Sequence, residues 1–165
     1  MSFNAFRPVL TGFRCSGVSA ADKIGNLRAY LAKEGGKSYL LSSLPNIAWI
    51  LNLRGSGQSS FNFRLSILTC SNSDITFVPV FYAYLLVELD TFTLFVDHGK
   101  VGQEVRAAVE GIGGVIRGYD DVWEGLGAAG KVCVNQAVSW ALVEAIGEVR
   151  PFSFAPFFPR DSDID

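Results

Sequence analysis

The stretch VPVFYAYLLVELDTFTLFVD, residues 78–97, decides the fold. It holds two apolar runs, 78–87 and 91–97, that are rich in aromatic and β-branched residues and are separated by the turn-like segment ELD. Two strands joined by so short a turn can pair only in the antiparallel direction. The stretch therefore predicts a β-hairpin.

Helical and extended patterns alternate on both sides of this hairpin. A helix is predicted from a capping-box-like Ser19 and Asp22 to a stop at Gly35-Gly36. Further segments follow: a strand at 37–43, a helix from Pro45, a helix at 101–108, a strand at 115–119, a short helix capped by Asp120, a strand at 131–134 and a helix at 139–146. The pattern predicts a three-layer α/β/α domain whose mixed sheet contains the β-hairpin and is covered on both faces.

The two ends of the chain lack such patterns. Residues 1–15 are interpreted as an N-terminal arm, because Pro8 interrupts any amphipathic helix there. Residues 149–165 hold three prolines and four phenylalanines without a period, so we expect an irregular tail.

Composition excludes several classes of function. The chain has 165 residues, enough for one domain, with 49% hydrophobic and 18% charged residues. A net charge of -2 without a basic stripe argues against nucleic acid and against a membrane surface, and the longest apolar run is well below the roughly 18 residues that span a bilayer. Cys15, Cys70 and Cys133 form no CxxC pair, which favours a reducing, cytoplasmic location.

The sequence offers few groups for chemistry. Asp97-His98-Gly99 places a base beside a carboxylate at a strand end, but a lone histidine in a turn is more often simply exposed. Asp120-Asp121 is better explained by helix capping than by metal binding. Neither Gly55-Ser56-Gly57 nor GIGGVIRG (111–118) completes a phosphate-binding glycine pattern, and the second fits a helix stop. No catalytic or metal-ligating residue is predicted.

Several blocks resemble one known family. PNIAWILNLRGS (45–56) followed by 74–97 is similar to a continuous block of the creatinase-type N-terminal (middle) domain of intracellular Xaa-Pro aminopeptidases (aminopeptidase P), which are pita-bread metallopeptidases. The helix at 17–31, VIRGYDDVW (115–123, against IRPYD in the family) and 131–146 continue the match. The resemblance covers about residues 16–148 and implies the creatinase N-terminal fold.

Residues 57–73 interrupt this block. A surface loop can lengthen at modest entropic cost, so a genuine insertion is one explanation. The other, which we favour, is a translated intron of about 45 nucleotides, because LTCS (68–71) is compatible with a branch-site-like and an acceptor-like sequence. Sequencing the transcript across codons 54–76 decides between them, since a message that always retains these codons excludes the intron.

The resemblance implies that catalysis belongs to a later domain. There, two Asp, one His and two Glu hold two metal ions, usually manganese, and a bridging hydroxide attacks the bond before proline. None of these ligands is assigned in residues 1–165, so a truncated, non-catalytic domain is expected, and it would meet proline-containing peptides through its parent enzyme. Alternatives are a stand-alone dimerisation domain, as a homodimer or a mixed dimer with a full-length relative, and a gene-model fragment.

Arg54 is the only substrate-proximal candidate. Its guanidinium fork suits a peptide carboxylate or carbonyl, whereas the alternative is a turn arginine paired with a local acid or carbonyl. Trp49, Phe77 and the phenylalanines of the tail are candidates for an exposed apolar patch facing other domains.

Overall fold

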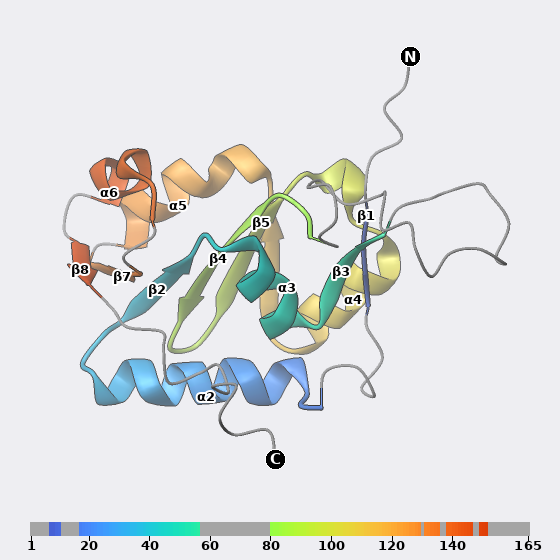
Figure 1. The fold of residues 1–165 in the computed structure, drawn as a ribbon, viewed down its shortest axis with the longest axis horizontal. Helices are drawn as coiled ribbons and strands as arrows, with labels where there is room; N and C mark the ends of the chain where they lie inside the picture. Colours follow the sequence, from blue (N-terminus) through green and yellow to red (C-terminus); the bar gives the residue numbers. More distant parts are fainter. Residues whose placement is uncertain are drawn as a thin grey trace, which may run out of the picture.

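The computed structural model describes residues 7–10, 17–56, 80–129, 131–135, 138–146 and 149–151. The elements in chain order are β1 (Arg7–Leu10), α2 (Ala20–Lys33), β2 (Ser38–Leu41), α3 (Leu44–Leu51), β3 (Leu53–Ser56), β4 (Ala83–Glu88), β5 (Phe92–Val96), the 3-10 helix η1 (His98–Lys100), α4 (Gln103–Gly111), β6 (Gly114–Arg117), the 3-10 helix η2 (Tyr119–Asp121), α5 (Val122–Ala129), β7 (Val132–Val134), α6 (Trp140–Ile146) and β8 (Val149–Pro151). Figure 1 shows their arrangement. No helix in these ranges combines the length and the apolar character needed to cross a bilayer.

The main sheet is mixed and six-stranded, in the order β6-β5-β4-β2-β7-β8. The predicted hairpin is confirmed, because β4 and β5 pair antiparallel with Leu85 opposite Leu94. The first strand is shorter than predicted and begins at Ala83. Ala83 pairs with Val96, the last residue of β5. Residues 80–82 therefore lie beyond the end of β5 and have no partner strand in this hairpin.

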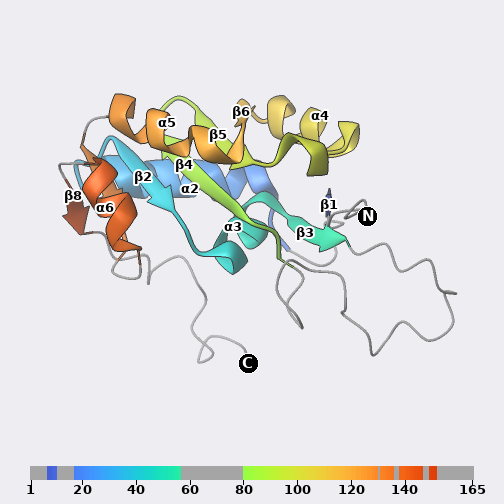
Figure 2. The same cartoon turned by 90° about the horizontal axis from the view of Figure 1, so that it is seen from above.

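Two layers of helices cover the sheet, and strand residues alternate between the two layers. Tyr39 and Leu41 of β2 pack in a core cluster with α2, α3 and α4, whereas Leu40 packs in a second cluster with α5 and α6. Figures 1 and 2 show α2 on one side of the sheet and α5 with α6 on the other. The predicted three-layer α/β/α architecture is therefore confirmed, and the alternation follows from the two-residue repeat of a strand.

The N-terminal arm contributes a strand that the sequence did not predict. β1 lies within residues 1–15 and pairs antiparallel with β3 in a small second sheet. Pro8 is compatible with this place because each strand of a two-stranded sheet has one unpaired edge, where a missing N–H costs nothing.

The prediction of an irregular tail was wrong for its first residues. β8 pairs parallel with β7, and Val132 lies opposite Val149. A strand of three residues at a sheet edge gains its order from the neighbouring backbone, so it needs no side-chain period of its own. The remainder of the tail and the interruption at 57–73 lie outside the described residues.

Candidate functional site

Asn52 shapes the junction between α3 and β3. It caps the C-terminus of α3 in the left-handed conformation, with φ 53° and ψ 39°, which asparagine tolerates better than most residues. Its side-chain amide donates to the Val18 carbonyl oxygen over 3.0 Å, and its Oδ1 accepts from Lys23 Nζ over 2.7 Å. Asn52 therefore turns the chain and ties the turn to the start of α2.

Lys23 completes this junction from the buried face of α2. Only 4% of the residue is exposed. Its Nζ also donates to the Trp49 carbonyl oxygen over 2.8 Å and lies 4.0 Å from the centre of the Trp49 ring. Burial lowers the pKa of the ammonium from its usual 10.5, while the two oxygen acceptors and the ring supply the contacts that a buried cation needs. We call Lys23, Trp49, Asn52 and the Val18 carbonyl the lysine clamp.

The clamp corrects one expectation. Trp49 was a candidate for an exposed apolar patch, but it is half-buried and packs against the main core cluster, with Lys23 over its ring. The other candidates, Phe77 and the phenylalanines of the tail, lie outside the described residues.

Arg54 lies two residues beyond the clamp. It was expected in a turn, yet it belongs to β3 and pairs with Val9 of β1, because Asn52 has already made the turn. Its side chain is exposed. Within the described part of the chain, no hydrogen bond or ion pair to its guanidinium is found.

A cleft lies at the carboxyl end of β5, which is the end of the hairpin away from its turn. The connections after β5 and β6 leave toward opposite faces, since α4 packs with α2 and α3 whereas α5 packs in the opposite layer. Diverging connections of adjacent parallel strands leave a crevice at their carboxyl ends. A cavity of about 590 Å³ lies there, and it is lined by Tyr82, Asp97, His98, Lys100, Gly118, Tyr119 and Asp120. We call it the β5–β6 cleft.

Asp97 and His98 thus lie in the cleft wall. The Asp97 Oδ1 accepts from the Gly99 backbone N–H over 2.9 Å and caps η1. His98 is exposed, as predicted for a turn histidine. The sequence did not reveal its cleft neighbours, because Tyr82 and Tyr119 come from segments preceding β4 and following β6.

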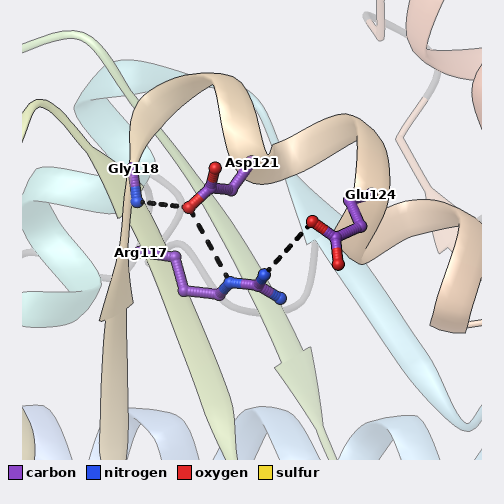
Figure 3. Close-up of polar contacts among 4 residues, drawn as sticks. All are labelled: Arg117, Gly118, Asp121 and Glu124. Atoms are coloured by element: carbon purple, nitrogen blue, oxygen red, sulfur yellow. Dashed lines mark hydrogen bonds and ion pairs between the residues drawn. The ribbon is translucent and has the colours of Figure 1, made fainter.

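The second wall is ordered by Asp121. The sequence assigned the cap to Asp120, but Asp121 Oδ2 accepts from the Gly118 N–H over 2.9 Å, whereas Asp120 is exposed in the cleft wall. Figure 3 shows Arg117 beside Asp121 and Glu124. The ion pairs that Arg117 forms with these two carboxylates measure 3.9 Å and 3.5 Å. These exposed ion pairs are long, so the cap orders η2 more than the charges do.

Aromatic stacking supports the same wall. The rings of Tyr119 and Tyr84 stack with centroids 5.1 Å apart. Burial, followed by its hydrogen bond to Tyr84, raises the pKa of the Tyr119 hydroxyl well above its usual 10.0.

The described ranges hold no group of three or more His, Cys, Asp or Glu side chains that could bind a metal ion. Cys133 is buried and forms no disulfide within these ranges. Gly55 lies in β3, and α4 ends at Gly111, as the helix-stop interpretation predicted.

The fold and these two sites define a three-layer α/β domain with a closed polar junction and an open cleft at its strand ends. The family model for the Creatinase/Prolidase N-terminal domain matches residues 8–154. The chain belongs to this family, and the match includes β8 and all of β1 except Arg7, beyond the 16–148 expected.

Curated relatives cover most of this chain. A probable Xaa-Pro aminopeptidase P from Neurospora crassa is 33% identical over 94% of this chain and 23% of its own length. Aminopeptidase P2 from Arabidopsis thaliana is 36% identical over 67% of this chain and 13% of its own length. The chain thus spans less than a quarter of these two relatives.

Solved structures share the fold. X-prolyl aminopeptidase from Caenorhabditis elegans, a cytosolic enzyme with a di-nuclear active site, matches 88% of this chain and 23% of its own with a TM-score of 0.74 at 20% identity. Aminopeptidase P from Streptococcus thermophilus matches 81% of this chain and 92% of its own with a TM-score of 0.55 at 12% identity.

Proposed function

We propose that this chain acts as the non-catalytic creatinase-type domain of an Xaa-Pro aminopeptidase. The parent enzyme hydrolyses the N-terminal residue that precedes proline, and its two metal ions, manganese in this proposal, are held by another domain. The family match over residues 8–154 is the observation that carries the proposal, and relatives named aminopeptidase P support it. A cytoplasmic location belongs to the proposal, as the Caenorhabditis elegans enzyme is cytosolic.

An activity assay tests the non-catalytic role. The chain 1–165 is incubated with manganese and a peptide with proline in second position, and no hydrolysis is expected. Turnover that a chelator abolishes would contradict the proposal, because it would require a metal centre in this chain.

A chimera tests the place of the domain in the parent enzyme. Residues 8–154 replace the matching segment of the Neurospora crassa relative, and the hybrid is compared with the same enzyme lacking that segment. We expect the hybrid to retain turnover and the deletion to lose it. A folded hybrid no more active than the deletion would argue against the assignment.

Arg54 is the proposed substrate-facing residue of this domain. Its exposed side chain belongs to β3, whose first residue directly follows Asn52 of the lysine clamp. The clamp therefore fixes the position of the backbone that carries the guanidinium. In the active chimera, Arg54→Ala should raise KM while Arg54→Lys raises it less, since a lysine keeps the charge but loses the bidentate fork. Unchanged KM in both variants would remove Arg54 from the site.

A second candidate is an interaction domain that forms a homodimer or binds a full-length relative. Trp140 at the start of α6 is 79% exposed, and Trp123 of α5 is 45% exposed. Exposed tryptophans are typical of protein interfaces. Sedimentation of the chain alone and with the Neurospora crassa relative tests this role, and only monomeric chain at micromolar concentration would exclude it.

A further inference from the structure

The β5–β6 cleft has no part in the proposed function. It lies at a switch point of the sheet, where open α/β folds bind ligands. Its volume of about 590 Å³ falls within the range of small-molecule sites. Its lining combines rings and charges, and these features define what it can bind.

Two tyrosines form the apolar part of the cleft. Tyr82 is 49% exposed, so its ring is accessible. Tyr119 is half-buried and stacked on Tyr84, which fixes its orientation. An aromatic or other cyclic side chain can pack on such rings without ordering a flexible side chain in the protein.

The charges lie on different walls. The η1 wall carries the donors Lys100 and His98, and the η2 wall carries the exposed carboxylate of Asp120. Asp97 lines the η1 wall as well, but its Oδ1 accepts from the Gly99 N–H and so helps to shape that wall. A ligand that bridges the walls meets donors at one end and an acceptor anion at the other.

We propose that the β5–β6 cleft binds a short peptide with free amino and carboxyl ends and one ring-bearing side chain. Its carboxylate faces Lys100 and His98, its ammonium faces Asp120, and its ring packs on Tyr82 and Tyr119. A ligand with a single charge would meet a complementary group on only one of the two walls. This binding is a property of the domain itself and does not depend on the activity of a parent enzyme.

Titration of the ¹⁵N-labelled chain 1–165 with the dipeptide Gly-Phe tests the proposal. Backbone amide signals of His98, Gly118 and Asp120 should shift in a saturable way, with a dissociation constant of about 10 mM or below. N-acetyl-Gly-Phe and Gly-Phe-amide each lack one charge and should bind about fivefold more weakly, the factor expected for one solvent-exposed ion pair. Gly-Gly, without a ring, should also bind more weakly.

Paired variants assign each end of the ligand. Asp120→Asn should weaken the binding of Gly-Phe about fivefold but leave the binding of N-acetyl-Gly-Phe unchanged. Lys100→Met should also weaken the binding of Gly-Phe about fivefold, but leave the binding of Gly-Phe-amide unchanged. Asp90→Asn, an exposed acid at the opposite end of the hairpin, is the matched control and should change nothing.

The ring contact is tested at Tyr82, where Tyr82→Phe should keep binding and Tyr82→Ala should lose it. The dispersed amide spectrum of each variant reports that it is folded. The proposal is overturned if no cleft amide shifts with Gly-Phe, or if Asp120→Asn weakens the free and the acetylated probe by the same factor. Such a result would leave the family assignment untouched, since no turnover is measured.

Discussion

The lysine clamp and the β5–β6 cleft use similar groups in opposite ways. In the clamp, Lys23 is buried and donates to two oxygens, so its charge is committed within the chain. In the cleft, Asp120 and His98 are exposed and face a cavity. The difference indicates that the clamp serves stability and the cleft is available for recognition, and substitutions should therefore affect stability at the first and binding at the second.

Removing the clamp cation should have the largest effect. Lys23→Ala removes one donor from Trp49 O and one from Asn52 Oδ1 and opens a void, so we expect a loss of roughly 2–4 kcal/mol in the free energy of unfolding. Urea unfolding measures it. Lys33→Ala in the same helix, at an exposed position, is the control and should stay within about 0.5 kcal/mol. A loss at Lys23 no larger than at Lys33 would show that the clamp is not stabilising.

The turn residue comes next. Asn52→Ala loses the bonds to Lys23 and to the Val18 carbonyl and forces alanine into the left-handed region, which should cost about 2 kcal/mol. Asn52→Gly loses the same bonds without that strain, so it should be more stable than Asn52→Ala by roughly 1 kcal/mol. Equal unfolding midpoints for the two variants would exclude backbone strain at this turn.

On the cleft wall, the cap should matter more than the ion pairs. Asp121→Ala removes the acceptor of the Gly118 N–H and should cost about 1 kcal/mol, as for other caps. Glu124→Ala removes only an exposed pair with Arg117 and should change stability by less than about 0.5 kcal/mol. Thermal unfolding of both variants at low and high salt checks this order, and a Glu124 effect equal to that of Asp121 would contradict it.

Local patterns in the sequence were sufficient for the central elements. The hairpin turn, the cap at Ser19 and the stop at Gly35-Gly36 act over a few residues, and the structure has all three. β1 and β8 were missed because each is a short edge strand ordered by a partner backbone, and β1 finds its partner β3 far along the chain. Pairing of that kind leaves almost no local signal.

The sites were predicted only in part, for a related reason. Lysine is rarely buried, so Lys23 was overlooked, although its spacing of four from Leu27 and eight from Leu31 places all three on the buried face of α2. Arg54 was suggested by the resemblance and stays a prediction, whereas Asp97 and His98, noted from their residue types, do lie in the cleft wall. The rest of the cleft depends on which face of the sheet α4 and α5 cover, and no short segment encodes that.

The smallest expected effect is on the pH dependence of the free energy of unfolding, to which Tyr119 of the cleft and Lys23 of the clamp contribute with opposite signs. The pKa of Tyr119 is raised in the folded chain, first by burial and then by its hydrogen bond to Tyr84. The stability linked to its proton is therefore complete below the unfolded value near pH 10 and is lost as the pH rises through the folded pKa. The lowered pKa of Lys23 acts with the opposite sign, since deprotonation there removes the cost of burying a charge.

Tyr119→Phe should thus lose less free energy of unfolding between about pH 9.5 and 11 than the natural chain, with a flat difference at lower pH. Urea unfolding across this range measures the free energy of unfolding of the variant and of the natural chain. Because Tyr119 is only partly buried and solvent screens its charge, the difference between the two should be modest. Parallel curves above pH 10 would mean that the Tyr119 proton is held no more tightly in the folded wall than in the unfolded chain.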